Sequence, residues 1–156
     1  MAGSEQHYQL ERPSFDRPVK VLIVVAPYYK DIADNMIAGA IAEIEAVGGT
    51  HEVIEVPGAL EVPTAIRIAY RGSNFDGFVA LGCVIRGETT HYDTVCNDSS
   101  NGLMLMGLEG ICIGNGILTV ENEAQAIVRA DPKQKDKGGE AAIAAMALLN
   151  LQNRFN

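Results

Sequence analysis

Apolar residues along the chain fall into two kinds of segment that alternate. Residues 19–25 are mostly β-branched and end at Ala26 and Pro27, a pattern typical of a buried strand. In residues 31–47 apolar side chains recur every three or four positions, and two glycines follow, which predicts a helix and its end. The same patterns predict strands at 19–25, 51–56, 77–85 and 111–120, and helices at 31–47, 61–70, 90–108, 121–130 and 138–152.

The alternation of strands and helices predicts the fold class. Right-handed crossover connections would give an all-parallel sheet of four strands that is covered by helices on both faces. We therefore expect a three-layer αβα sandwich. A chain of 156 residues suits one domain, which we place at residues 19–156. Residues 1–18, which contain Pro13 and Pro18, are expected to form an N-terminal arm that the core does not need.

Composition and cysteine content favour a cytoplasmic protein. Hydrophobic residues make up 47% of the chain and charged residues 21%, which is ordinary for a globular protein. No apolar run approaches the roughly 20 residues of a membrane span, and the N-terminus lacks the pattern of a signal peptide. The three cysteines, Cys83, Cys96 and Cys112, show no paired spacing, so we expect buried thiols in a reducing compartment rather than disulfides or a zinc site.

The net charge of −8 argues against nucleic acid or an anionic membrane as a partner. An anionic substrate would have to be held by local cations or by backbone amides. One basic cluster is a candidate, although on charge alone a solvated loop is the more ordinary explanation for it. Its members are Arg129, Lys133, Lys135 and Lys137.

Ligands of parallel α/β sheets bind beyond the carboxyl ends of the strands. This rule selects four loops, at 27–30, 57–61, 86–91 and 114–120. The third loop offers backbone amides, the positive end of a helix dipole and the hydroxyls of Thr89 and Thr90, which together would suit a phosphate. Alternatively, one of these threonines merely caps the helix. Glu88 would have to point away from a bound phosphate.

Three further positions near these strand ends are candidates for chemistry. His91 follows the phosphate loop and would suit proton transfer, although a lone histidine is often structural. Tyr28 or Tyr29 could stack on a planar heterocycle or could simply pack. Glu61 could bind hydroxyls, or could lie in an ordinary turn that starts a helix. No metal-ligand spacing, P-loop or dinucleotide fingerprint is present, so we expect no metal site.

Four segments of the chain together resemble the lumazine synthase family. They read VPGALEVP at 56–63, LGCVIRGETTHYD at 81–93, GILTVEN at 116–122 and KGGEAA at 137–142. They occur in the order and spacing of the family and span residues 19 to about 150. The resemblance implies a flavodoxin-like fold. It also implies condensation of 5-amino-6-(D-ribitylamino)uracil with 3,4-dihydroxy-2-butanone 4-phosphate, without a cofactor, in the penultimate step of riboflavin biosynthesis.

The resemblance also implies roles for individual residues, carried over by position. Tyr28 would be the platform for the pyrimidine, His91 the proton-transfer residue and Arg129 the phosphate-binding arginine, with Lys137 in its vicinity. The ribityl chain would be received by Ala59, Leu60 and Glu61, the pyrimidine edge by backbone groups of Cys83, Val84 and Ile85, and the phosphate by the loop positions Glu88 and Thr89. Arg129 and Asn115 would reach the site from the neighbouring subunit of a homopentamer.

One position departs from a common form of the family pattern. Asn115 stands where many members present an aromatic ring from the neighbouring subunit. The pyrimidine would then be stacked on one side only, by Tyr28, with Asn115 offering a polar contact. We expect this difference to affect affinity more than activity.

Other functions on the same architecture are less well supported. An electron carrier would need a hydroxyl-rich and glycine-rich loop after the first strand, which residues 27–31 do not provide. A phosphoacceptor domain would need acidic residues at the ends of the first and third strands, but residues 25–26 and 85–86 are not acidic. A catalytically weak flavin-binding or shell-forming member of the family is a further alternative, against which His91 and Arg129 speak. The sequence does not distinguish single pentamers from paired ones or from a sixty-subunit shell.

Overall fold

The computed structural model describes residues 7–156 and contains one four-stranded parallel sheet. Its strands are β1 (Lys20–Val25), β2 (Thr50–Glu55), β3 (Gly77–Ile85) and β4 (Ile113–Val120), in the order β2-β1-β3-β4. The helices are α1 (Lys30–Ala46), the 3-10 turn η1 (Ala59–Glu61), α2 (Val62–Gly72), α3 (His91–Leu108), α4 (Glu123–Ala130) and α5 (Lys137–Phe155). The predicted parallel sheet of four strands is confirmed.

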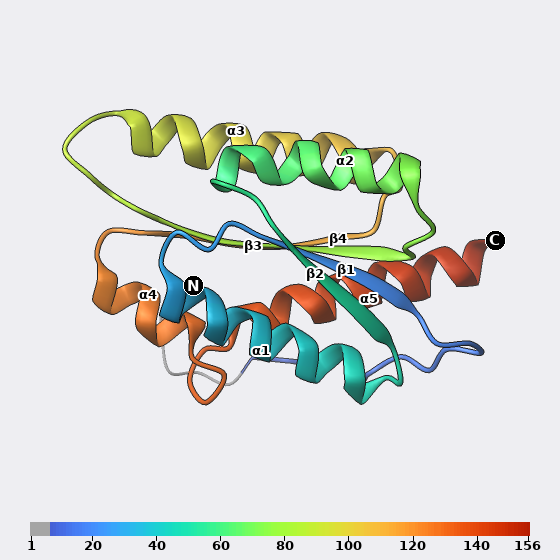
Figure 1. The fold of residues 1–156 in the computed structure, drawn as a ribbon. Helices are drawn as coiled ribbons and strands as arrows, with labels where there is room; N and C mark the ends of the chain where they lie inside the picture. The colour runs from blue at the N-terminus through green and yellow to red at the C-terminus, as the bar shows by residue number, and fades with distance from the viewer. Residues whose placement is uncertain (1–6) are drawn as a thin grey trace.

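Two helical layers enclose this sheet (Figure 1). Because successive side chains of a strand point to opposite faces, Val21, Ile23 and Val25 of β1 pack toward α1, α4 and α5. Leu22 and Val24 pack on the other face toward α2 and α3. The expected three-layer αβα sandwich is therefore confirmed, with α2 and α3 in one outer layer and α1, α4 and α5 in the other.

Most predicted element boundaries lie within one or two residues of the observed ones. β3 has the predicted bounds, and Pro63 lies in the first turn of α2, where a missing N–H group costs nothing. α4 begins two residues later than predicted. Asn122 has an extended backbone, and its side-chain oxygen accepts the N–H of Gln125 at 3.0 Å, so this residue caps the helix instead of belonging to it.

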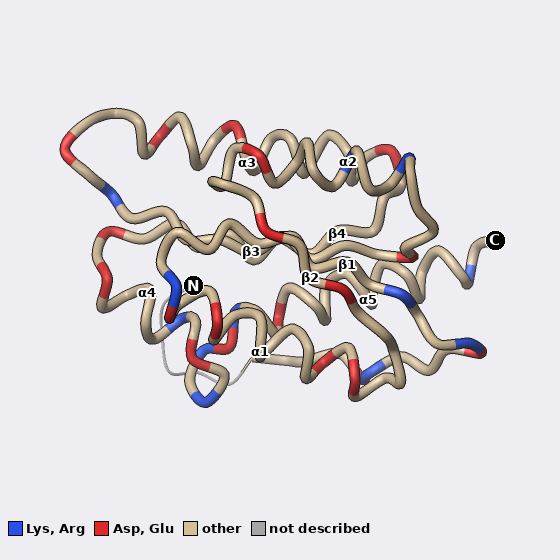
Figure 2. The backbone as a smooth tube through the Cα atoms, in the orientation of Figure 1, with Lys and Arg blue, Asp and Glu red and all other residues tan. Residues whose placement is uncertain are grey.

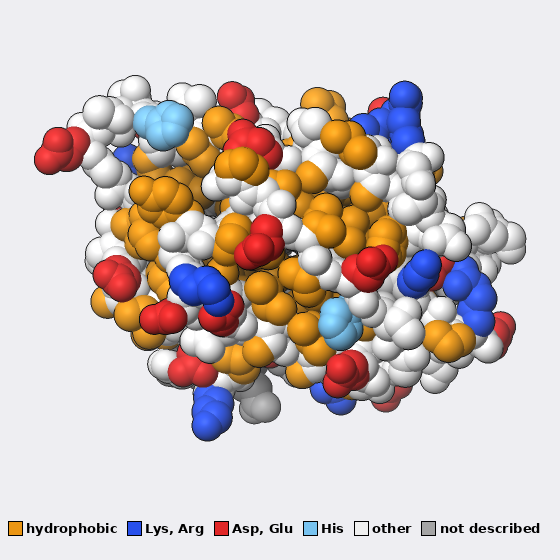
Figure 3. Space-filling view, viewed as in Figure 1, with side chains coloured by type: hydrophobic (Ala, Val, Ile, Leu, Met, Phe, Trp, Pro, Cys, Tyr) orange, Lys and Arg blue, Asp and Glu red, His pale blue; other side chains and the backbone are white. Residues whose placement is uncertain are grey.

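The edge strand β2 departs from the expectation of a sheet covered on both faces. Five of its six side chains are exposed, including Val53 and Ile54. Both helical layers pack mainly over the other three strands, and only α1 contacts β2 substantially. In the space-filling view, apolar side chains lie open across the middle of the molecule, where β2 crosses (Figure 3). The expectation is therefore correct for β1 and β3, wrong for β2 and only half correct for β4, whose Asn115 and Thr119 side chains are exposed.

Glycines let α5 lie unusually close to its neighbours. A Cβ atom at Gly114 of β4 would collide with the carbonyl oxygen of Ala141, and one at Gly138 would collide with the carbonyl oxygen of Met36. Backbone atoms cannot move aside as a flexible side chain can. These two contacts fix the start of α5, and with it Lys137, against β4 and α1.

The described part of the predicted arm, residues 7–18, contains neither helix nor strand, and residues 1–6 lie outside the described residues. Arg12 pairs with Glu43 of α1 at 3.0 Å, and Arg17 pairs with Asp76 at 2.7 Å. Phe15 packs against the core that faces α1. The arm is thus attached to the domain at three places. No helix among residues 7–156 is both long and apolar enough to cross a membrane.

Candidate functional site

The carboxyl ends of the strands meet at one edge of the sheet. Val25 of β1 lies beside Glu55 of β2 and Leu81 of β3, and Ile85 of β3 lies beside Val120 of β4. The predicted loops 27–30, 57–61 and 86–91 all start from this edge. The fourth predicted loop, 114–120, is wrong, because these residues form the body of β4 and the connection follows at residues 121–122.

β3 extends four residues beyond its pairing with β1, which ends at Leu81. Ala26 donates its N–H to the carbonyl oxygen of Leu81 at 2.9 Å, so the backbone of Leu81 points toward β1. Since alternate residues of a strand point the same way, Cys83 and Ile85 present their backbone N–H and C=O groups on this unpaired side. The groups of Val84 instead face β4. Cys83 and Ile85 thus leave backbone groups free on the side of β1, whereas the backbone groups of Val84 are engaged in the pairing with β4.

The thiol of Cys83 contributes little to acid–base chemistry. Burial, with a contribution from nearby Glu123, raises its pKa to about 11, so the thiol stays protonated at neutral pH. All three cysteines are free, but only Cys112 is fully buried, whereas Cys83 and Cys96 are half-buried. The expectation of three buried thiols is therefore correct for Cys112 alone.

The loop 86–91 presents free backbone donors beside a long helix. Within residues 7–156, the N–H groups of residues 87–90 donate to no acceptor. They lie just before α3, an 18-residue helix whose first turn carries partial positive charge. Glu88 and Thr89 are exposed in this loop. Unpaired donors and a helix N-terminus are the two features that an anion seat requires.

His91 is the first residue of α3, and its side chain is exposed. Its backbone N–H donates to the hydroxyl oxygen of Thr89 over a long 3.3 Å. Thr90 occupies the N-cap position without a side-chain capping bond. The alternative that a threonine caps this helix therefore holds only for Thr89, and only through that one bond.

The two tyrosines after β1 have different surroundings. Tyr28 is 78% exposed and meets Tyr29 edge to face, with ring centroids 5.0 Å apart. Tyr29 is half-buried against the core, and this burial raises the pKa of its hydroxyl. The packing alternative thus describes Tyr29. The ring of Tyr28 is left open to stack on a ligand.

The turn η1 contacts both α3 and β3. Ala59 is buried there, Leu60 is 37% exposed and Glu61 is exposed. The N–H of Glu61 donates to the carbonyl oxygen of Gly58 at 3.1 Å, and a Cβ added at Gly58 would lie 3.2 Å from the carboxylate of Glu61. The backbone around Glu61 therefore forms the ordinary turn that we gave as the alternative explanation for this residue. The Glu61 carboxylate is nevertheless open to a ligand at the carboxyl edge of the sheet.

A second group of predicted residues lies elsewhere. Asn115 of β4, Arg129 of α4 and Lys137 of α5 line one hollow of about 410 Å³. The side-chain oxygen of Asn115 accepts the N–H of Ile117 at 3.0 Å, which leaves its amide nitrogen to donate. Lys137 pairs with Glu140 at 2.8 Å. No salt bridge within residues 7–156 engages Arg129, whose guanidinium donates to the carbonyl oxygen of Gln125 at 3.1 Å.

The connection between α4 and α5 carries basic residues on an ordered backbone (Figure 2). The carboxylate of Asp131 accepts the N–H of Lys133 at 2.9 Å and a side-chain N–H of Gln134 at 3.0 Å. Asp136 has the left-handed φ of 46° and accepts the N–H of Gly139 at 3.2 Å, so it caps α5. The solvated-loop alternative fits Lys133, which is exposed. We did not predict the capping role of Asp136, for which the sequence offered only its place before a helix.

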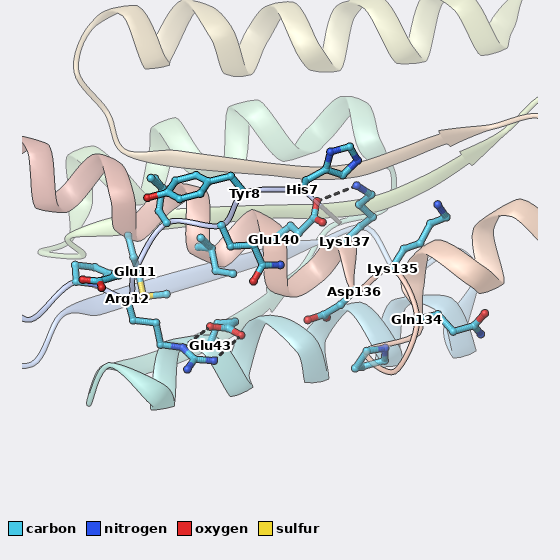
Figure 4. A pocket seen from close by; sticks show the side chains of 16 residues that line it. His7, Tyr8, Glu11, Arg12, Glu43, Gln134, Lys135, Asp136, Lys137 and Glu140 are labelled. Atoms are coloured by element: carbon cyan, nitrogen blue, oxygen red, sulfur yellow. Dashed lines mark hydrogen bonds and ion pairs between the residues drawn. The ribbon is translucent and has the colours of Figure 1, made fainter. Parts of the chain in front are cut away.

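A larger hollow of about 1550 Å³ lies between the arm, α1 and the start of α5. His7 and Tyr8 of the arm lie beside Lys137 and Glu140 there (Figure 4). This hollow contains Lys137 but none of the predicted residues of the carboxyl edge. Its mixed lining of acidic and basic side chains favours no single ligand charge.

We also did not predict a set of contacts around Arg86. Its Nε lies 2.7 Å from a carboxylate oxygen of Glu121, and Nη1 lies 3.8 Å from Asp93. The guanidinium also lies 4.3 Å from the centre of the Tyr92 ring. Glu121 lies 35 positions from Arg86 in the sequence, so no local sequence pattern predicts that the two residues pair. Within residues 7–156, no group of three or more His, Cys, Asp or Glu side chains could hold a metal ion.

The chain matches known proteins along most of its length. The family model described as 6,7-dimethyl-8-ribityllumazine synthase matches residues 18–153. A protein of that name from Jannaschia sp. (strain CCS1) is 57% identical over 155 residues, which cover 99% of this chain and 86% of the relative. A protein of the same name from Novosphingobium aromaticivorans is 57% identical over 137 residues, which cover 88% of this chain and 99% of the relative. The protein named 6,7-dimethyl-8-ribityllumazine synthase 1 from Rhizobium meliloti is 49% identical over 145 residues, which cover 89% of this chain and 95% of the relative. The chain therefore belongs to the 6,7-dimethyl-8-ribityllumazine synthase family.

Proposed function

We propose that the protein is a transferase that makes 6,7-dimethyl-8-ribityllumazine from 5-amino-6-(D-ribitylamino)uracil and 3,4-dihydroxy-2-butanone 4-phosphate. The observation that carries this proposal is the family match over residues 18–153, supported by relatives that are 57% identical and bear the synthase name. The amine forms an imine with the ketone and releases water. Phosphate is then eliminated, and ring closure releases a second water.

The residues at the carboxyl edge suit the pyrimidine substrate. Tyr28 supplies an open ring, Cys83 and Ile85 supply unpaired backbone groups, and the Glu61 carboxylate faces the ribityl hydroxyls. His91, exposed at the start of α3, transfers protons during imine formation and ring closure. Ala59 and Leu60 contribute the backbone that holds the ribityl chain.

Two groups of donors suit the phosphate of the second substrate. The loop with Glu88 and Thr89 offers N–H groups that are free within residues 7–156, and the Glu88 carboxylate would have to point away from the anion. Arg129 offers a guanidinium without a carboxylate partner in residues 7–156, with Lys137 and the Asn115 amide in the same hollow. An arginine can hold phosphate through two charge-assisted bonds, which matters in a chain with a net charge of −8.

We propose further that the two groups meet only across the interface of a homopentamer. His91 starts α3 and Arg129 lies in α4, and these two helices cover opposite sides of the sheet, which supports a site that is shared between two chains. Exposed apolar side chains on β2, α2 and α3, such as Ile54, Ile68 and Leu105, offer surface for such an interface. Head-to-tail contacts of this kind close into a ring when the rotation fits.

A catalytically weak flavin-binding or shell-forming protein is less well supported. Such a protein would have no need of an Arg129 that lacks a carboxylate partner in residues 7–156, or of an exposed His91 beside amides that are unbonded in the same range. We place the protein in the cytoplasm, where the three free thiols would stay reduced. We also propose the division into an arm at 1–18 and one domain at 19–156.

The proposed activity has a direct assay. Purified protein is mixed with both substrates, and the fluorescence of the lumazine product and the release of inorganic phosphate are followed together. The proposal predicts equal amounts of the two products without added metal or cofactor. Flavin binding without product formation would favour the alternative.

A further inference from the structure

Arg86 stands where β3 ends and the phosphate loop begins. Its side chain makes three contacts that lead to two different elements. Nε bonds to Glu121 at 2.7 Å, just before α4, whereas Nη1 lies 3.8 Å from Asp93 and the guanidinium plane covers Tyr92, both in the first turn of α3. The backbone N–H of Arg86 also donates to the carbonyl oxygen of Val120 at 3.0 Å. Arg86 therefore ties the two ends of the loop to the end of β4.

The loop itself has few other attachments. The N–H groups of residues 87–90 are unbonded within residues 7–156, and a Cβ at Gly87 would have nothing within 4 Å. Within the described residues 7–156, the only hydrogen bond of residues 87–91 that involves a side chain is the long one from the His91 N–H to the Thr89 hydroxyl. Free amides suit anion binding, but the loop that carries them must be held in place by something else. The 2.7 Å bond from Arg86 to Glu121 is shorter than the contact between His91 and Thr89 and links the start of the loop to the start of α4.

The far end of the attachment is firmly placed. The backbone N–H of Glu121 donates to the side-chain oxygen of Gln125 at 2.8 Å, and Asn122 caps α4. Glu121 thus belongs to a hydrogen-bonded helix start rather than to a loose loop. An anchor of this kind can fix a partner in position even where the ion pair is partly exposed to solvent.

We propose that Arg86 is a positioning residue that holds the free amides of residues 87–90 and the His91 side chain in register for the phosphate-bearing substrate. Arg86 does not bind the phosphate itself, because its guanidinium is already shared by Glu121, Asp93 and the Tyr92 ring. The inference rests on the proposed function, but its structural half, the ordering of the loop, can be measured separately.

The test compares Arg86→Gln with a matched control, Arg67→Gln. Arg67 also pairs with a carboxylate, Glu109 at 3.2 Å, and also lies near an aromatic ring, that of Tyr70. The two arginine side chains have similar exposure, 44% and 38%. Because exposed ion pairs add little stability, both variants should stay within a few degrees of the wild-type Tm. The Tm therefore does not distinguish the two variants, whereas the order of the loop and the enzyme kinetics do.

Two readouts decide the proposal. NMR order parameters of the backbone amides at 87–91 should be lower in Arg86→Gln than in the wild type, and unchanged in Arg67→Gln. In the assay, kcat/KM for the butanone phosphate should fall on the order of ten- to a hundredfold in Arg86→Gln, the cost of a misplaced substrate-positioning group. The KM for the pyrimidine should change much less. The charge-reversed pair Arg86→Glu with Glu121→Arg should recover part of the loss.

Unchanged order parameters at 87–91 in Arg86→Gln would overturn the proposal, whether or not the protein proves active. Kinetics that match those of Arg67→Gln would overturn it as well. A wild-type protein that forms no lumazine would instead overturn the proposed function, and the order parameters would still decide whether Arg86 orders the loop.

Discussion

His91 and Arg129 belong to opposite faces of the β-sheet. His91 starts α3, which packs with α2 on one face, whereas Arg129 lies near the end of α4, which packs with α1 and α5 on the other. Both helices begin at the carboxyl edge of the sheet (Figure 1). A proton-transfer group and a phosphate-binding group in these places serve one reaction most simply when two copies of the chain meet.

Replacing His91 by alanine should slow turnover without abolishing it. Much of the rate of a two-substrate condensation comes from holding both partners in register, where effective molarities are large. General acid–base help is worth roughly 10²–10⁴-fold, and solvent replaces part of it. Single-turnover product fluorescence measures the effect, with His51→Ala of β2 as the control that should keep wild-type rates. Complete loss of activity in folded His91→Ala would contradict the claim that holding the two substrates in register supplies much of the rate.

Replacing Arg129 by alanine should weaken the binding of the butanone phosphate far more than the binding of the pyrimidine. Losing hydrogen bonds from a charged group costs about 1.5–3 kcal/mol, which corresponds to roughly a ten- to hundredfold rise in KM for the phosphate substrate. Titrating each substrate at saturation of the other measures both constants. Lys133→Ala, which removes an exposed charge from the adjoining connection, should have a smaller effect. Equal changes in both KM values for Arg129→Ala would remove Arg129 from the phosphate site.

Asp76 should stabilise the fold in a pH-dependent way. Burial alone would raise the pKa of this carboxyl, but hydrogen bonds from Arg17 and from the backbone N–H of Lys20 outweigh burial and lower it. A lowered pKa means that the stabilisation is present above the unfolded-state pKa of about 3.9 and is lost as the pH falls through the folded-state value.

Asp76→Asn should therefore lower the free energy of unfolding near pH 7 by about 1 kcal/mol or less, since solvent screens the partly exposed pair. The difference from the wild type should shrink once the pH falls below about 4. Thermal unfolding across a pH series measures it, with the exposed Asp34→Asn as a control. A difference that stays constant with pH would show that charge is not the cause.

Gly138→Ala should destabilise the protein strongly. The new Cβ would collide with the backbone oxygen of Met36, so α5 must shift away from α1, at a cost on the order of 3 kcal/mol. Gly107 of α3 offers the opposite case, because its added Cβ meets nothing within 4 Å. Gly107→Ala should be neutral or stabilising by about 0.5–1 kcal/mol, since alanine favours the helix. Chemical unfolding of both variants measures the contrast, and similar values would contradict the packing argument.

Local patterns predicted much of this fold. The β-branched runs and the turns that bound them placed β3 correctly, and alternation with helices implied the parallel sheet whose carboxyl edge carries Tyr28, Glu61 and His91. The sequence could not show that β2 stays exposed, because its neighbours are set by tertiary packing. The start of α4 was missed because Asn122 lies next to a helical pattern that it only caps.

The contacts that the sequence did not reveal join residues far apart in the chain or depend on backbone geometry. Arg86 and Glu121 meet only because β3 and β4 are neighbours in the sheet. Asp136 adopts its left-handed backbone in the tight connection into α5, and an aspartate in the sequence does not by itself reveal this conformation. The roles of Arg129 and Asn115 at a neighbouring subunit came from family resemblance. The structure adds that these two residues and Lys137 share one hollow.

The measurement that tests the central claim most directly is complementation between two inactive variants. One variant carries a severe replacement of His91 and the other a severe replacement of Arg129, so in either pure ring every site lacks one group. With random one-to-one mixing, each partner is intact half the time, so about a quarter of the sites in mixed rings should be whole. Co-refolded protein should therefore be far more active than the average of the two separate preparations, whereas mixing without dissociation should give no gain. Verified mixed rings without any gain in activity would place His91 and Arg129 in the same subunit's site and would contradict the account.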